Sequence, residues 1–165
     1  MKTILLLLAV VAVAHAGVTL TLSSDDIEAF LEAHNDVRNE LGIPSLVWDT
    51  TLAEFAEDWT SRCEFEHSNQ QYGENLYQNG PLDDNATYLA YRSAASWLKE
   101  LEYVDDDWEC IAQDSPTCGH YSQMVWRDSV SVGCAITQCE ENEEMPNLVS
   151  CNYDPPGNHG GQQPY

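Results

Sequence analysis

Histidine and glutamate side chains stand in short polar segments between the stretches expected to form the core. His67 and Glu74 lie seven residues apart, and His120 stands near the start of the segment GHYSQMVW. Neutral imidazole and carboxylate together bind zinc or a similar divalent cation, and they also suit general acid–base chemistry. These residues are far apart in the chain, and no HExxH-type helix places them together. A hydrogen-bonded polar cluster without a metal is therefore the alternative interpretation.

Two serines stand close to these histidines and have to be considered as nucleophiles. They are Ser68, next to His67, and Ser122, two residues after His120. Neither lies in a G-x-S-x-G turn, and nothing in the sequence indicates an oxyanion hole. We expect both hydroxyls to bond to backbone groups, assign no catalytic residue, and favour a binding protein over an enzyme.

Helical periodicity predicts the elements that must position these side chains. Apolar residues recur at helical spacing over residues 24–41, with Ser23 or Ser24 as the cap and Gly42 at the end. A second helix is expected to start behind Asp49 and to run to about Cys63. A third is expected over residues 85–101, with these residues facing inward: Leu89, Ser93, Trp97 and Leu101.

The last third of the chain has the character of strands. Residues 131–138 and 147–153 are expected to form two of them, and residues 73–78 a shorter one. Helices followed by strands indicate an α+β fold.

The N-terminus has the three parts of a secretory signal. Lys2 is followed by an apolar run over residues 4–13 and by Ala14-His15-Ala16, a suitable cleavage site. Ten apolar residues rise only about 15 Å as a helix, which is too short for a membrane core of roughly 30 Å. We therefore expect residues 1–16 to be removed, leaving residues 17–165 as one secreted, extracellular domain.

The charge of this mature chain excludes several partners. Five Lys and Arg residues stand against 28 carboxylates, a net charge of about −23. Such a surface repels phosphate backbones and anionic lipid head groups, so no nucleic acid partner and no stable membrane insertion are expected. We expect a soluble monomer.

The cysteines indicate a disulfide framework. All six lie in the mature chain, and an even number in an exported protein predicts three bridges, for which 15 pairings are possible. They are Cys63, Cys110, Cys118, Cys134, Cys139 and Cys151. Export also makes Asn85, in the sequon Asn85-Ala86-Thr87, a candidate for glycosylation.

Several motifs, in order along the chain, resemble the CAP superfamily of cysteine-rich secretory proteins, antigen-5 proteins and group-1 pathogenesis-related proteins. The likeness covers nearly all of the mature chain and is greatest to the short, single-domain pathogenesis-related class. It rests on AHNDVRNELGIPSLVWDTTLAEFAEDW at 33–59, YGENLY at 72–77, GHYSQMVWRDS at 119–129, VGCAITQC at 132–139 and SCNYDPPGN at 150–158.

The resemblance implies a three-layer α-β-α sandwich with three disulfides. The implied pairs are Cys63–Cys139, Cys110–Cys118 and Cys134–Cys151. It also implies that two histidines and two glutamates converge in a central cleft, where zinc or another divalent cation is the expected cofactor. They are His67, Glu74, Glu100 and His120, with Glu102 as the competitor that the W-x-x-E-x-x-Y register disfavours.

Lipid binding is the activity that the resemblance favours. Members of this family that bind lipids hold a sterol beside an aromatic loop that follows the third helix. The matching residues here are Trp97, Leu101, Tyr103 and Trp108. Aromatic faces suit the flat sterol skeleton, although the same side chains could instead pack the core. The run Asp105–Asp107 departs from the pattern by making this loop acidic.

The C-terminal residues 155–165 resemble the segment that plant relatives release as a defence peptide. We therefore expect a secreted CAP-domain protein that binds sterols or related small lipids in defence or host interaction. The alternatives are a metal-dependent hydrolase or protease at the His/Glu cleft and a precursor of a signalling peptide, with an unidentified extracellular receptor.

Overall fold

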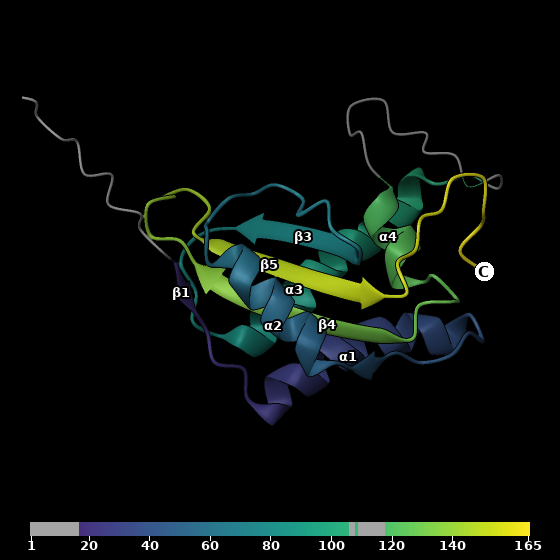
Figure 1. Ribbon diagram of the computed structural model, residues 1–165, viewed down its shortest axis with the longest axis horizontal. Helices are drawn as coiled ribbons and strands as arrows, with labels where there is room; N and C mark the ends of the chain where they lie inside the picture. Colours follow the sequence, from purple (N-terminus) through teal and green to yellow (C-terminus); the bar gives the residue numbers. More distant parts are fainter. Residues whose placement is uncertain (1–16, 106–107, 109–117) are drawn as a thin grey trace, which may run out of the picture.

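A five-stranded sheet runs through the centre of the protein (Figure 1). The computed structural model describes residues 17–105, Trp108 and residues 118–165, so the expected signal peptide and Cys110 lie outside the described residues. Strands β1 (Val18–Thr19), β4 (Ser131–Gln138), β5 (Asn147–Asp154) and β3 (Gly73–Asn79) follow one another across the sheet, and β2 (Val47–Trp48) also pairs with β4. The β4–β5 and β5–β3 pairs are antiparallel, whereas β2 runs parallel to β4.

The longer helices begin at side-chain caps. Helix α1 (Ser24–Glu40) starts with a capping box in which Ser23 and Asp26 each bond to the other's backbone N–H. Asp49 caps α2 (Thr50–Thr60), and Asn85 caps α3 (Ala86–Leu98). The chain then tightens into the 3₁₀-helix η1 (Lys99–Tyr103), and α4 (Gly119–Met124) follows.

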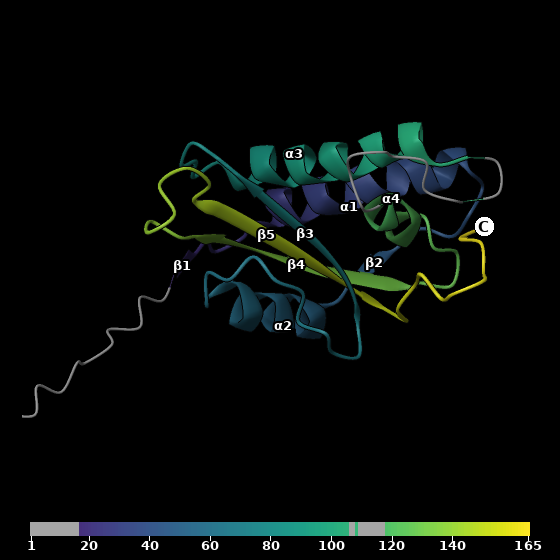
Figure 2. The ribbon, with the colours of Figure 1, turned by 90° about the horizontal axis from the view of Figure 1, so that it is seen from above.

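The helices form two layers around the sheet, which gives the expected three-layer α-β-α sandwich. Helix α2 covers one face, while α1, α3 and α4 lie on the other (Figure 2). Strands β4 and β5 are buried along nearly their whole length because both faces are covered. Gly133 on β4 allows the close approach of α2, since a Cβ atom there would clash with the backbone of Asp49, Leu52 and Ala53.

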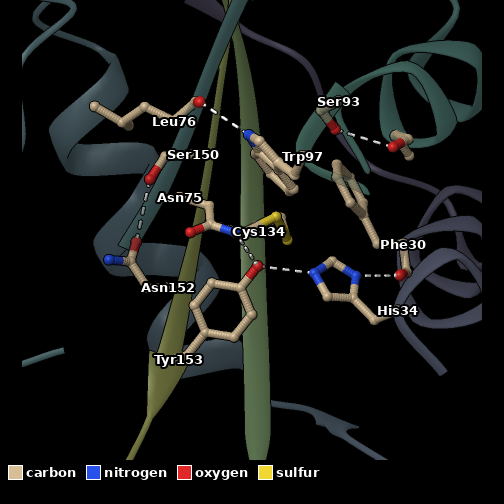
Figure 3. Close-up of a disulfide and its surroundings, with 12 residues drawn as sticks. Phe30, His34, Asn75, Leu76, Ser93, Trp97, Cys134, Ser150, Asn152 and Tyr153 are labelled. Carbon is tan, nitrogen blue, oxygen red and sulfur yellow. Dashed lines mark hydrogen bonds between the residues drawn. A yellow bond between two sulfur atoms is a disulfide. The ribbon is translucent and has the colours of Figure 1, made fainter. Parts of the chain in front are cut away.

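A buried polar network links α1 to the sheet (Figure 3). His34 Nδ1 lies 2.7 Å from the carbonyl oxygen of Phe30, and His34 Nε2 lies 2.8 Å from the Tyr153 hydroxyl. The proton therefore sits on Nδ1, and Nε2 accepts from Tyr153. Asn75 Nδ2 in turn donates to the Tyr153 oxygen at 3.1 Å and to the carbonyl of His120 at 2.9 Å. His34 is thus a satisfied core histidine.

The disulfides agree with the implied pairing. Cys63–Cys139 joins the loop after α2 to the end of β4, and Cys134–Cys151 joins residues that face each other on β4 and β5. Cys118 is also disulfide-bonded, and its expected partner Cys110 lies outside the described residues. Loop-entropy arguments give roughly 4–5 kcal/mol for the first bridge and about 3 kcal/mol for the second.

The structure differs from the sequence expectations mainly after the third helix. The α-helix ends at Leu98 rather than continuing to Leu101, because the chain continues as η1. The change of pitch turns the Leu101 side chain outward, so that it is 51% exposed. Residues 119–124, for which the sequence pattern predicts no element, form α4.

The C-terminal segment 155–165 wraps over α4 rather than hanging free. The Gly157 N–H donates to Gln123 Oε1 at 2.8 Å, and the Arg127 N–H donates to the carbonyl of Pro164 at 2.7 Å. The Tyr165 ring lies edge-on to Trp108, with centroids 5.0 Å apart. These contacts attach the segment to the domain at both of its ends.

Candidate functional site: a helix groove beside two His–Glu pairs

His67 and Glu74 form the first of two His–Glu pairs. His67 Nδ1 lies 2.7 Å from Glu74 Oε1, which also accepts the Ser68 N–H at 2.9 Å. The histidine side chain is 53% exposed, whereas the glutamate is only 5% exposed. The hydrogen bond to Glu74 raises the pKa of His67. Burial alone would raise the pKa of Glu74, but the bonds from His67 and Ser68 outweigh it and lower that pKa.

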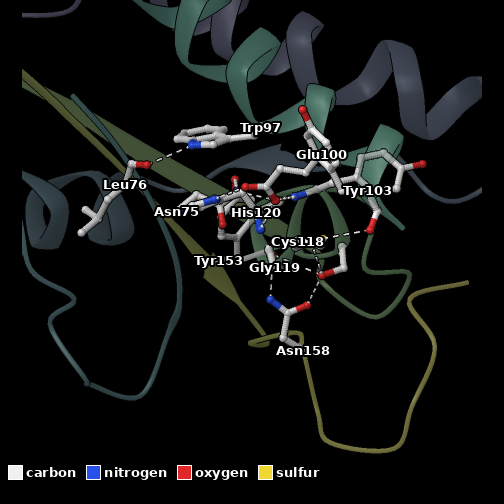
Figure 4. A network of polar contacts seen from close by, with 12 residues as sticks. Asn75, Leu76, Trp97, Glu100, Tyr103, Cys118, Gly119, His120, Tyr153 and Asn158 are labelled. Carbon is white, nitrogen blue, oxygen red and sulfur yellow. Dashed lines mark hydrogen bonds and ion pairs between the residues drawn. The ribbon is translucent and has the colours of Figure 1, made fainter. Parts of the chain in front are cut away.

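His120 and Glu100 form the second pair (Figure 4). His120 Nδ1 lies 2.6 Å from Glu100 Oε1, while Glu100 Oε2 accepts the N–H groups of His120 and Tyr121 at 2.8 and 3.1 Å. The carboxylate on η1 therefore holds both the imidazole and the first turn of α4. The Trp97 ring stacks on His120, with centroids 6.2 Å apart. The register argument that chose Glu100 over Glu102 selected the residue that touches His120.

The two pairs do not combine into a three-donor metal site among the described residues. Within the described part of the chain, no group of three or more His, Cys, Asp or Glu side chains lies close enough to hold one ion. Of the two serines, Ser122 donates to the carbonyls of Cys118 and Gly119 and to Asn158 Oδ1. Within the part of the chain that the structure describes, neither serine hydroxyl bonds to an imidazole, so no Ser–His couple is formed there.

The four residues expected to hold a lipid fall into different places. Trp97 lies in the core, 2% exposed, with its indole N–H bonded to the carbonyl of Leu76 at 3.0 Å. Trp108 stacks on Tyr121 and lines a cavity of about 280 Å³ against the C-terminal segment. Tyr103 is 45% exposed and lines neither this cavity nor the groove described next. Of the four, Leu101 borders that groove.

A groove of about 470 Å³ lies between α1 and α3, which run side by side above the sheet (Figure 2). Its volume falls within the range of roughly 300–1,000 Å³ that is typical of small-molecule sites. The lining is mostly apolar and comes from α1, α3, η1 and α4: Ala33, Val37, Ala94, Ala95, Leu98, Leu101 and Tyr121. We call this feature the α1–α3 groove.

The rim of the α1–α3 groove is acidic. Asp36 and Glu40 line it, and they continue a column of exposed carboxylates on α1 that begins with Glu28 and Glu32. Tyr91 on α3 also lines the groove, and its hydroxyl donates to Glu32 Oε2 at 2.5 Å. Sequence reasoning missed these rim residues, although the four-residue spacing of the carboxylates was visible.

Asn85 lies on the surface at the start of α3. Its Oδ1 accepts the Tyr88 N–H at 2.9 Å, and the residue is exposed. The cap therefore uses the oxygen of the amide and leaves the nitrogen, to which a glycan would be attached, outside that bond.

Among the described residues, every helix is too short or too polar to span a membrane.

Comparison with known proteins identifies the family to which this fold belongs. The profile of the cysteine-rich secretory protein family, CAP, matches residues 31–153. Pathogenesis-related protein 1A of Nicotiana tabacum is 43% identical over 140 residues, covering 82% of this chain and 79% of the relative. Pathogenesis-related protein 1 of Arabidopsis thaliana is 33% identical over 165 residues, covering 97% and 95%. The crystal structure of NaASP2 with Zn²⁺ has a TM-score of 0.72 at 24% identity and covers 87% of this chain and 86% of that one.

The fold is thus an α-β-α sandwich with two His–Glu pairs, one made through Glu74 on β3 and one through His120 on α4. The chain belongs to the CAP family, and within it to the short pathogenesis-related class.

Proposed function

We propose that this protein binds a sterol or a related small lipid in the α1–α3 groove. The observation that carries the proposal is an apolar groove of about 470 Å³ that is open on the surface between two helices. Its floor of alanine, valine and leucine side chains offers a smooth surface to a flat ring skeleton, and burial of that skeleton is worth roughly 25 cal/mol per Å².

A sterol also needs one polar partner for its hydroxyl, and the rim supplies several. Asp36 and Glu40 can accept hydrogen bonds. The Tyr91 oxygen can also accept one, because its hydroxyl already donates to Glu32. An apolar floor with a few polar groups at one edge is the usual composition of a site for an amphiphile.

Equilibrium binding of labelled cholesterol to the protein tests the proposal. Ala95→Trp fills the groove, because Ala95 is an exposed residue of α3 that lines it. Ser96→Trp is the matched control, since Ser96 is the next exposed residue of α3 and does not line the groove. We expect saturable binding by the wild type and by Ser96→Trp and its loss in Ala95→Trp. Equal binding by both variants would place the ligand elsewhere.

Export and a role in defence complete the proposal. They are supported by the predicted secretory signal and by relatives whose names are pathogenesis-related proteins. N-terminal sequencing of the protein from culture medium should begin at Gly17.

Digestion with an N-glycosidase should reduce the mass of the wild type and leave Asn85→Gln unchanged if Asn85 carries a glycan.

A divalent cation is a second candidate ligand. Each histidine is held through Nδ1 by a carboxylate, the arrangement that in metal sites leaves Nε2 for the ion. Glu74 Oε2 is also buried with no hydrogen-bond partner among the described residues. The donor types therefore fit zinc, although the described donors do not form a group of three.

Titration calorimetry with zinc tests this second candidate. One ion shared by His67 and His120 requires that His67→Ala and His120→Ala each abolish binding. Unchanged zinc affinity in both variants would exclude it.

A further inference from the structure

The polar atoms at the rim of the α1–α3 groove share one property, which is that they all accept hydrogen bonds. Asp36 and Glu40 are carboxylates that line the groove. The Tyr91 hydroxyl donates its hydrogen bond to Glu32 Oε2 at 2.5 Å, so only its oxygen lone pairs remain for a ligand. No Lys or Arg is found among the described lining residues.

The surroundings of the groove reinforce this preference. The column Glu28, Glu32, Asp36 and Glu40 is spaced by four residues along one face of α1, so its charges lie in a row. The pKa of Tyr91 is raised, chiefly by the hydrogen bond to Glu32 and further by the negative charges of Glu32, Asp36 and Glu28. Arg38, the cation on α1 closest in sequence to this row, is buried and turns its guanidinium toward the carbonyls of Met124, Trp126 and Ser129.

We propose that the α1–α3 groove selects its ligand by head group, accepting hydroxyl and ammonium groups and rejecting carboxylate, sulfate and phosphate groups. An ammonium or a hydroxyl donates to the acceptors at the rim. An anionic head group has no hydrogen-bond donor to offer at neutral pH, and the negative charges of Asp36 and Glu40 repel it. At an effective dielectric constant of about 20, the repulsion energy between two close like charges is several times the thermal energy. The anion should therefore bind at least about tenfold more weakly.

The inference rests on the proposed lipid binding and names the ligand class at that site. It is tested with one ring skeleton and three head groups: cholesterol, cholesterol sulfate, and the analogue with an amine in place of the hydroxyl. We expect the amine to bind at least as tightly as cholesterol and the sulfate at least about tenfold more weakly, with the difference reduced at high salt.

Two double variants separate the local charges from the overall charge. Asp36→Asn with Glu40→Gln should bring the sulfate to within about threefold of cholesterol, because the repulsion at the rim is removed. Glu143→Gln with Glu144→Gln removes the same two charges from the exposed turn between β4 and β5 and should leave the wild-type order unchanged.

The outcomes distinguish this inference from the function on which it rests. Saturable binding of cholesterol and its sulfate with equal affinity would overturn the charge selection and leave lipid binding intact. A wild-type order that persists in Asp36→Asn with Glu40→Gln would likewise overturn it. Failure of all three ligands to bind would overturn the proposed lipid binding, and the charge selection with it.

Discussion

The Trp108 indole lies parallel to the Tyr121 ring, with centroids 6.1 Å apart and an interplanar angle of 6°. Tyr121 also lines the α1–α3 groove, and Trp108 meets the edge of Tyr165 at the C-terminus. This aromatic stack therefore connects one wall of the groove to the C-terminal segment. Trp108 therefore supports a wall of the proposed lipid site without lining the groove itself.

Trp108→Ala should weaken cholesterol binding but not abolish it. Loss of the stack removes the support of Tyr121, whereas the floor of the groove remains, so we expect a loss of affinity of about threefold to tenfold, or roughly 1 kcal/mol for one aromatic pair. Equilibrium binding of labelled cholesterol measures it. Complete loss of binding in Trp108→Ala together with full binding by Ala95→Trp would move the site from the groove to the Trp108 cavity.

Arg38→Met should destabilise the domain strongly. The buried Arg38 guanidinium donates to the carbonyls of Pro44, Met124, Trp126 and Ser129 at 2.7–3.0 Å. Burial lowers the pKa of Arg38 to about 10, so it remains charged at neutral pH. Its loss leaves several buried acceptors unsatisfied, and we expect a decrease of at least about 3 kcal/mol in the free energy of unfolding.

Urea unfolding measures this decrease, and Arg92→Met is the matched control. Arg92 is exposed and lies 6.0 Å above the Tyr88 ring, so its replacement should change the unfolding free energy by about 0.5 kcal/mol or less. Comparable losses in the two variants would contradict the structural role of Arg38.

His34 should make the protein less stable in mild acid. Burial lowers its pKa from 6.5 to about 4, so the folded state keeps the imidazole neutral. Between these values the unfolded chain binds a proton that the folded chain does not, and stability falls as the pH is lowered. The full contribution is about 3 kcal/mol, because each unit of pKa difference is worth about 1.4 kcal/mol.

Unfolding free energies of the wild type and His34→Gln from pH 7 to pH 4.5 test this effect. The variant should be less stable at pH 7, where it disturbs the bonds to Phe30 and Tyr153, but its stability should decline less steeply toward acid. Parallel pH profiles for the two proteins would show that His34 does not titrate in this way.

Local signals predicted much of this fold from the sequence. The sequence predicted the cap at Ser23 and the bounds of β4 correctly, because both depend on residues that are neighbours in the chain. The buried position of Arg38 was not found, because its partners are backbone carbonyls of residues 44 and 124–129. The short helix α4 was missed because a six-residue helix shows less than two turns of periodicity.

The candidate site was only partly predictable for the same reason. The motif resemblance named all four members of the two His–Glu pairs, but their pairing and separation depend on the tertiary arrangement. The α1–α3 groove exists only where two helices lie side by side, so its alanines carried no signal of their own. By sequence alone Asp36 and Glu40 are ordinary charged positions of a helix, and only the packing of α3 against α1 brings Tyr91 and Leu98 to the same groove.

Titration of isotope-labelled protein with cholesterol, followed by amide chemical shifts in NMR spectra, tests whether the α1–α3 groove holds the sterol. We expect saturable shifts concentrated at Ala33, Val37, Ala95 and Leu98, four of the helical residues that line the α1–α3 groove. The amides of β4 and of α2 should change little. Shifts confined to Val104, Trp126 and His159 would place the sterol in the cavity beside Trp108, which these residues line. The absence of any saturable change would show that the protein does not bind the sterol.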